Sequence, residues 1–284
     1  MKELRGLGTA LITPFKADKS VDYEALARLL DTQLTGSVDY IVVLGTTGEA
    51  ATMTEVEKRE VRTFIRKYVN GRLPLVLGVG GNNTAAVCET LKTIDLTGFE
   101  AILSVCPYYN KPNQEGLHQH FCAVAEASPI PVILYNVPGR TGVNLLPETV
   151  MRIYDAHPDK IAGIKEASGN VEQIKHLIDL AKDKLLVISG DDGIACEIME
   201  AGGAGLISVA SNAFPENFYA IVHKKDQAKQ AQYDQMIKLL FKEGNPVGIK
   251  AVLAQKGIIQ NYLRLPLVPA SKDLQEEIQK EMAK

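Results

Sequence analysis

The stretch that decides the fold is IAGIKEASGNVEQIKHLIDLAKDKLLVI, residues 161–188. It begins and ends with short runs of Ile, Leu and Val, at 161–164 and 185–188. Each run is too short for a buried helix and too uniformly apolar for a strand with one solvated face, which is typical of a parallel strand covered on both faces. Between the runs, Asn170 can cap a helix whose apolar residues, within 174–181, fall on one face. The stretch therefore predicts a strand–helix–strand unit.

Similar apolar runs occur on both sides of this unit. They lie at 9–13, 40–44, 75–79, 101–105, 132–135 and 205–209, which makes eight in all. Helical spacing recurs between them, for example at 61–69, behind a capping box of Thr54 and Glu57. The alternation predicts an α/β fold, and eight consecutive units favour a closed TIM (β/α)8 barrel over a doubly wound open sheet.

Beyond the eight units the pattern changes. After Pro215 only helical spacing remains. We therefore expect residues 1–224 to form a catalytic barrel and residues 225–284 to form a C-terminal helical extension packed on the barrel. These additional helices are candidates for contacts between subunits.

The composition argues against several kinds of partner. The 284 residues are 46% hydrophobic, and 31 Lys and Arg against 34 Asp and Glu give a formal net charge of −3. Because no run of like charges is present, no nucleic-acid or membrane partner is expected. Residues 1–14 lack the pattern of a signal peptide, and no segment approaches the roughly 20 apolar residues of a membrane span. We therefore expect a cytoplasmic protein.

Patterns for metals and cofactors are weak. The cysteines are scattered, so we expect buried free thiols at Cys88, Cys106, Cys122 and Cys196. His118 and His120 would point to different faces of a helix. Asp191 and Asp192 lack nearby ligands, and capping a helix is their simpler role. Residues 78–81 are glycine-rich but lack the ending of a phosphate loop.

The candidate chemistry lies where the predicted strands end, because active sites of such barrels are built there. Lys165 follows an apolar run, where partial desolvation favours the neutral amine that attacks a ketone. Its alternative role is an ion pair with Glu166 or another carboxylate. Tyr135 ends the preceding strand and could be a general acid and base. Thr46 and Thr47, flanked by glycines, could bind a carboxylate or simply form a tight turn.

A second Gly-Ile-Lys tripeptide ends at Lys250. It follows Asn245 and Pro246 and leads a helix outside the eight predicted strands. We therefore expect Lys250 to be the poorer nucleophile of the two lysines.

Four motifs carry a family resemblance: GTTGE at 45–49, PYYN at 107–110, YNVPGRTG at 135–142 and GIKEASG at 163–169. Their order and spacing resemble the pyruvate-dependent class I aldolase superfamily that contains dihydrodipicolinate synthase and N-acetylneuraminate lyase. The similarity covers essentially the whole chain. It implies a TIM barrel that needs neither a metal nor an organic cofactor, and a homotetramer built as a dimer of dimers.

The resemblance also implies the catalytic roles. Lys165 would form a Schiff base with pyruvate. Tyr135 would relay protons together with Thr46, and Tyr109 from the neighbouring subunit would complete the relay. The resulting enamine would attack the aldehyde of aspartate semialdehyde, and ring closure and transimination would then release the cyclic product from the lysine.

The substrate-binding residues follow from the same resemblance. Thr47 would hold the pyruvate carboxylate, while Gly190 and Ile207 would line the site with backbone carbonyls. Arg140 matches an arginine that receives the semialdehyde carboxylate in the synthases and is absent from the sialic-acid lyases. A guanidinium fork suits a carboxylate better than sugar hydroxyls. The synthase branch is therefore expected, with a sialic-acid lyase or a 2-keto-3-deoxy sugar acid aldolase as the alternative.

Two readings outside the family stay open on the residues alone. One is a metal-dependent or phosphate-binding barrel enzyme, which would need a clustered ligand set. The other is a catalytically silent barrel that serves as a regulator, against which intact Lys165 and Tyr135 argue. Trapping of pyruvate on the protein discriminates among the three.

A regulatory site is also implied, with departures from the family pattern. Members inhibited by lysine bind it at the dimer interface, where Asn82 and Tyr108 match. Glu55 and Lys58 stand where sensitive enzymes often carry histidines, and Ala86 replaces a glutamate that meets the effector's ammonium. Losing an anion and gaining a cation weakens the binding of a cationic amino acid. We expect weak or absent inhibition by lysine.

Overall fold

The computed structural model describes residues 4–284, and this part of the chain contains eight parallel strands. They are β1 (Gly6–Ala10), β2 (Tyr40–Val43), β3 (Leu75–Gly78), β4 (Ala101–Val105), β5 (Val132–Asn136), β6 (Ile161–Glu166), β7 (Leu186–Ser189) and β8 (Gly205–Ser208). The strands are hydrogen-bonded in chain order as a closed barrel. The predicted TIM barrel is confirmed, and the open sheet is excluded.

Helices alternate with the strands in the order that the sequence predicts. The α-helices are α1 (Tyr23–Thr35), α2 (Glu55–Val69), α3 (Thr84–Thr93), α4 (Gln114–Ala127), α5 (Pro138–Thr141), α6 (Pro147–Ala156), α7 (Val171–Ala181), α8 (Ala195–Glu200), α9 (Pro215–Lys224), α10 (Gln227–Phe241), α11 (Val247–Gln255) and α12 (Lys272–Met282). Short 3₁₀ helices are η2 (Thr46–Gly48), η3 (Ala50–Thr52), η4 (Asp192–Ile194) and η5 (Ala210–Asn212). Within residues 4–284, no helix has the length and apolar character needed to cross a membrane.

The chain divides into two compact units. The first holds residues 4–5 and Pro74–Ile207, and the second holds Gly6–Leu73 and Ser208–Lys284. The expected boundary between residues 224 and 225 stays a prediction, and residues 1–3 of that predicted barrel domain lie outside the described residues.

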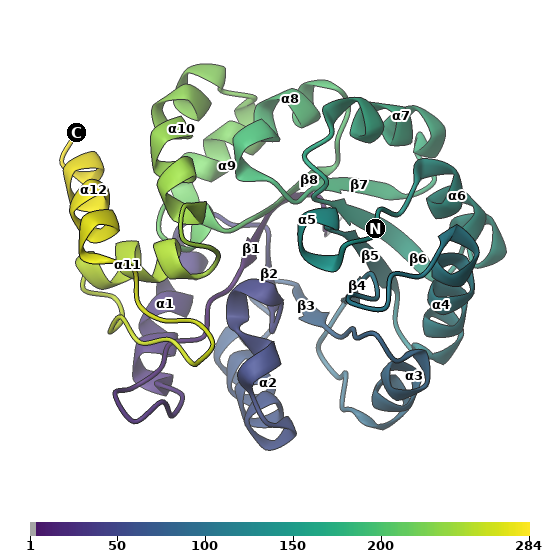
Figure 1. The fold of residues 1–284 in the computed structure, drawn as a ribbon, viewed down its shortest axis with the longest axis horizontal. Helices are drawn as coiled ribbons and strands as arrows, with labels where there is room; N and C mark the ends of the chain where they lie inside the picture. The colour runs from purple at the N-terminus through teal and green to yellow at the C-terminus, as the bar shows by residue number, and fades with distance from the viewer. Residues whose placement is uncertain (1–3) are drawn as a thin grey trace. The chain divides into compact units, whose positions relative to one another are not determined.

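In the first unit, parallel strands run side by side with buried side chains on both faces. Figure 1 shows β5, β6 and β7 as neighbours, with α6 and α7 running alongside. The predicted cap of α7 is confirmed, because the Asn170 side chain accepts a hydrogen bond from the Gln173 N–H. Ile174, Leu177 and Ala181 of α7 are buried, as expected for the face that packs on the sheet.

In the second unit, β1 begins three residues earlier than predicted, at Gly6 instead of residue 9. Gly8 pairs with Tyr40 of β2, and a Cβ on Gly8 would lie 2.2 Å from Cε2 of the Tyr40 ring. The strand thus needs glycine where the sequence pattern looks for apolar side chains. The other strands agree with their predicted bounds to within two residues.

The helices of the second unit also follow from local sequence. Thr54 and Glu57 form the predicted capping box at the start of α2, each side chain bonding the other's backbone N–H. At the C-terminal end of the chain, α10, α11 and α12 contact one another pairwise and lie together, green to yellow in Figure 1. Helix α11 is therefore packed against α10 and α12 within the second unit.

Candidate active site

In the first unit, Lys165 and Tyr135 are partners across neighbouring strands. The register of β5 and β6 pairs Tyr135 with Lys165, so both side chains project to the same face of the sheet. The Lys165 Nζ lies 4.4 Å from the centroid of the Tyr135 ring. Both residues are buried, with 6% and 7% of their surface exposed. An amine and a phenol are therefore held together in a largely desolvated place.

Gly190, just beyond β7, makes room for the Lys165 side chain. A Cβ on Gly190 would lie 2.8 Å from Cε of Lys165 and 2.7 Å from the Cβ of Ala167. The Gly190 N–H donates to the Glu166 carbonyl at 2.7 Å, which fixes the backbone at that approach. Any larger residue would displace the lysine side chain.

The Glu166 carboxylate has partners other than a lysine. It is fully buried and accepts hydrogen bonds from Asn136 Nδ2 at 3.0 Å, from the Ser168 N–H at 2.8 Å and from Gln173 Nε2 at 3.3 Å. Burial raises the pKa of this carboxyl group, while the hydrogen bonds oppose that shift. As the next residue along β6, Glu166 projects to the face opposite Lys165. These contacts argue against the alternative in which Lys165 forms an ion pair with Glu166.

Several predicted residues of the first unit lie at its surface. Tyr109 is 89% exposed and has a positive φ of 74°, which non-glycine residues seldom adopt. Tyr108 is also exposed, and its carbonyl accepts a hydrogen bond from Asn82 Nδ2 at 3.1 Å. Arg140 is exposed on the short helix α5. By contrast, Ile207 is buried on β8.

In the second unit, Thr46 and Thr47 begin the 3₁₀ helix η2, so the GTTG stretch is a tight turn as well as a carrier of hydroxyls. Thr46 is exposed, whereas Thr47 is buried. The Thr47 Oγ1 accepts a hydrogen bond from Asn245 Nδ2 at 2.9 Å. The turn therefore displays two hydroxyls in different surroundings.

Lys250 is buried, which the sequence did not indicate. It forms an ion pair with Glu49, donates from Nζ to the Tyr262 carbonyl at 3.0 Å and lies 4.2 Å from the Phe15 ring centroid. Burial lowers the pKa of Lys250 to about 8, although Glu49 opposes the shift. These partners hold the amine in place, and the expectation that Lys250 is the poorer nucleophile stays a prediction. In the sequence, Lys250 is marked only by the second Gly-Ile-Lys tripeptide and by Asn245 and Pro246 before it.

The remaining candidates have structural roles. Asp191 caps η4 and accepts a hydrogen bond from the Gly193 N–H at 2.8 Å, as the simpler reading predicted. Among residues 4–284, no group of three or more His, Cys, Asp or Glu side chains is arranged to hold a metal ion. All four cysteines are free, but Cys88 and Cys122 are only half-buried. Burial raises the pKa of the Cys106 thiol and keeps it unreactive.

A closed (β/α)8 barrel with a buried lysine and tyrosine paired on neighbouring strands is typical of one class of protein. That class is the enzymes that bond a carbonyl substrate to a lysine amine, the class I aldolases and their relatives.

Comparisons with known proteins define the group more closely. The model of the dihydrodipicolinate synthetase family matches residues 3–284. A 4-hydroxy-tetrahydrodipicolinate synthase of Parabacteroides distasonis is 50% identical over 273 residues, which cover 94% of this chain and 92% of the relative. A dihydrodipicolinate synthase structure from Thermotoga maritima has a TM-score of 0.94 at 38% identity and covers 98% of this chain and 97% of its own. A monomeric dihydrodipicolinate synthase variant also gives 0.94 at 38% identity, with 99% and 96% covered.

The chain therefore belongs to the dihydrodipicolinate synthetase family, and it is an enzyme of the lyase type.

Proposed function

We propose that this chain catalyses the 4-hydroxy-tetrahydrodipicolinate synthase reaction. Pyruvate condenses with L-aspartate 4-semialdehyde in the diaminopimelate route of lysine biosynthesis. Family membership over almost the whole chain supports this assignment. The observation that carries the mechanism is the contact between Lys165 and Tyr135.

Lys165 supplies the nucleophile. Its amine attacks the keto carbon of pyruvate, and loss of water gives an iminium that withdraws electrons from the neighbouring methyl group. A methyl proton leaves to give an enamine, whose carbon attacks the aldehyde of the semialdehyde. Tyr135 moves protons during these steps, since its phenol belongs to the side chain that touches the lysine. This chemistry requires neither a metal nor an organic cofactor.

Four residues form the substrate-binding site in this proposal. Thr47 donates to the carboxylate of pyruvate, and Gly190 and Ile207 line the site through their backbone. Arg140, exposed on α5, receives the carboxylate of the semialdehyde through its guanidinium fork. The presence of this arginine favours the synthase over a sialic-acid lyase or a sugar-acid aldolase.

Thr46 and Tyr109 complete the proton relay, with Tyr109 contributed by a neighbouring subunit. An 89% exposed tyrosine on a strained backbone suits a residue that acts outside its own chain. We therefore propose a homo-oligomer, a tetramer built as a dimer of dimers, in the cytoplasm. One of the similar structures is a monomeric dihydrodipicolinate synthase variant. Sedimentation of the wild type beside Tyr109→Phe, with activity measured on each, tests the proposed oligomer.

A coupled assay tests the reaction itself. Pyruvate and aspartate semialdehyde are supplied together, beside separate assays for cleavage of N-acetylneuraminate and 2-keto-3-deoxygluconate. Turnover of pyruvate with the semialdehyde, and of neither sugar acid, supports the proposal. Cleavage of either sugar acid without turnover of the semialdehyde would refute it. Borohydride added with pyruvate should attach a pyruvate-derived mass to the peptide that contains Lys165, and to no other lysine.

A further inference from the structure

Thr47 receives a hydrogen bond from a residue far along the chain. Asn245, just before α11, donates from Nδ2 to the Thr47 Oγ1 at 2.9 Å, and both side chains are buried. A threonine hydroxyl has one hydrogen and two lone pairs. Because Asn245 occupies a lone pair, the single hydrogen of the Thr47 hydroxyl is left for another acceptor.

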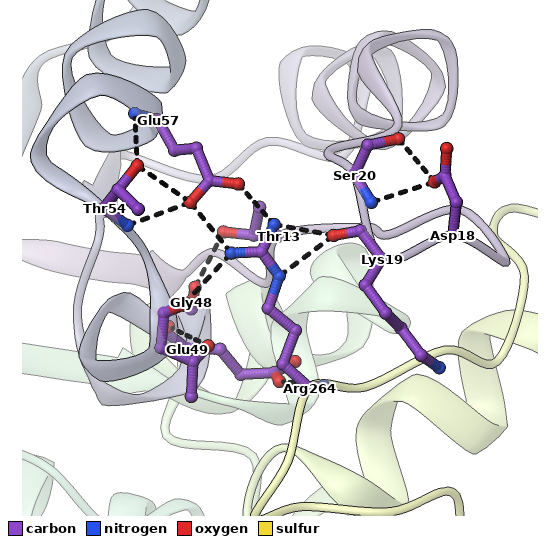
Figure 2. A network of polar contacts seen from close by, with 10 residues as sticks. Thr13, Asp18, Lys19, Ser20, Gly48, Glu49, Thr54, Glu57 and Arg264 are labelled. Carbon is purple, nitrogen blue, oxygen red and sulfur yellow. Dashed lines mark hydrogen bonds and ion pairs between the residues drawn. The ribbon is translucent and has the colours of Figure 1, made fainter.

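The turn that carries Thr47 is held in place by contacts of the two residues that follow, Gly48 and Glu49. Glu49 has a left-handed backbone with φ 52°, and its carboxylate is buried in an ion pair with Lys250. The Glu49 Oε2 also accepts from the Arg264 N–H at 3.1 Å. Thr13 Oγ1 donates to the Gly48 carbonyl at 2.8 Å, and Figure 2 shows both contacts beside each other. The hydroxyl of Thr47 is thus set on a backbone with little freedom to adjust.

Arg264 is itself anchored by several groups. Its guanidinium pairs with the Glu57 carboxylate and donates from Nη1 to the Thr52 carbonyl at 3.1 Å and from Nη2 to the Lys19 carbonyl at 2.6 Å. In Figure 2 the Arg264 side chain extends between Glu57 and Lys19. The C-terminal part of the chain therefore holds the turn at two residues. Asn245 contacts Thr47, and both Lys250 and Arg264 contact Glu49.

We propose that Asn245 is a positioning residue that makes the Thr47 hydroxyl a dedicated hydrogen-bond donor for the carboxylate of pyruvate. An anion accepts hydrogen bonds and donates none, so the hydroxyl is useful only if its hydrogen points to the substrate. The amide of Asn245 supplies that direction without adding charge near the anion. This inference rests on the proposed function.

The test is a double-mutant cycle on Asn245 and Thr47. Asn245→Ala should raise the KM for pyruvate about ten-fold, as expected for one hydrogen bond to a charged group. Because the lost hydrogen bond weakens pyruvate binding equally in the ground state and the transition state, kcat and the KM for the semialdehyde should stay within about two-fold of the wild-type values. In the Thr47→Val background, Asn245→Ala should have no further effect on the KM for pyruvate, because the hydroxyl through which it acts is gone.

Additive effects in the cycle, or an equal loss for both substrates, would overturn the role of Asn245. Asn245→Asp is a near-isosteric second variant that tests the same point if the alanine variant folds poorly. Its carboxylate accepts the Thr47 hydrogen and repels the substrate, so its KM for pyruvate should exceed that of Asn245→Ala. An Asn245→Asp enzyme with wild-type KM would equally contradict the proposal.

Gln255→Ala is a matched control on α11. This amide donates from Nε2 to the Gln275 carbonyl at 2.8 Å and has no part in the proposed site, so its KM for pyruvate should be unchanged. Thermal unfolding of each variant separates loss of fold from loss of binding. Borohydride trapping of pyruvate on the wild type separates the two hypotheses: no adduct overturns both, whereas an adduct with an additive cycle overturns only the role of Asn245.

Discussion

Lys165 and Tyr135 are register partners on β6 and β5, with the lysine Nζ 4.4 Å from the centre of the tyrosine ring. Strand pairing, which involves backbone hydrogen bonds on both sides of each residue, fixes this contact. The amine and the phenol are consequently positioned before any substrate arrives. Such preorganisation is the main structural contribution that a protein makes to a reaction of this kind.

The first prediction separates the roles of this pair. Tyr135→Phe keeps the ring but removes the hydroxyl, so kcat should fall by about 10²- to 10⁴-fold, the usual contribution of a general acid and base. Lys165→Ala should abolish both turnover and borohydride trapping of pyruvate. Lys160→Ala serves as the control, since this lysine donates to the Ser128 carbonyl and should trap pyruvate normally at Lys165. Wild-type turnover by Lys165→Ala would remove the basis of the mechanism.

Gly190→Ala should lower the activity by displacing the Lys165 side chain, although the lysine itself is unchanged. The new Cβ would lie 2.8 Å from Cε of Lys165, well inside normal contact distance, so the amine must move. A displacement near 1 Å can cost about 100-fold in rate, and we expect a loss of about 10- to 100-fold in kcat/KM. In Gly139→Ala the added methyl meets nothing within 4 Å, so its rate of pyruvate trapping should equal that of the wild type. Equal activity of both alanine variants would contradict the packing argument.

The ion pair of Glu57 and Arg264 predicts a dependence of stability on pH. Hydrogen bonds from Arg264 lower the pKa of Glu57 from the ordinary 4.5 to about 2. A depressed pKa of a carboxyl group contributes stability that is present above pH 4.5 and is lost as the pH falls from 4.5 towards 2. After a discount for partial exposure to solvent, Glu57→Gln should lower the free energy of unfolding by about 1–2 kcal/mol at pH 7.

Urea unfolding of wild type and Glu57→Gln at pH 7 and pH 3 measures this difference. The gap between them should shrink at pH 3, because the native carboxylate is then losing its advantage over the unfolded one. A gap that is constant with pH would show that the ion pair contributes nothing through its charge. Glutamine can retain the capping role of Glu57 at α2, so the comparison reports the loss of the carboxylate charge, which Arg264 and Thr54 both stabilise.

The buried pair of Lys250 and Glu49 predicts a rescue. Lys250→Met leaves the Glu49 carboxylate buried without its partner, which should cost about 3–5 kcal/mol of stability. Adding Glu49→Gln removes the stranded charge and should recover part of that loss. Denaturant unfolding of both variants provides the measurement. If the double variant is less stable than Lys250→Met, the two groups do not act as an ion pair.

Inhibition by L-lysine is predicted to be weak or absent. Ala86 is exposed and carries no charge, and Lys58 forms an ion pair with Glu55 at 2.8 Å. Neither position offers the free anion that attracts a cationic amino acid. Steady-state assays with increasing L-lysine should therefore show little loss of activity below millimolar concentration, and Ala86→Glu should increase the sensitivity. Strong inhibition of the wild type at sub-millimolar lysine would refute this expectation.

Local patterns in the sequence determined the order of strands and helices, the capping box at Thr54 and the cap at Asn170. These features depend on residues close together in the chain, so periodicity and spacing suffice to read them. The motifs around Lys165 and Tyr135 likewise placed both residues at strand ends and indicated their family. The catalytic and binding roles of all the candidate residues, Lys165 and Tyr135 included, stay predictions.

Only the tertiary structure decided which distant groups meet. It paired Tyr135 with Lys165 in register, buried Lys250 against Glu49, and joined Asn245 to Thr47 across 198 positions of sequence. It also showed why β1 contains glycine, since the Tyr40 ring occupies the space of a side chain at Gly8. Contacts of this kind leave no local pattern, because each partner is chosen by the folded backbone and not by its neighbours along the chain.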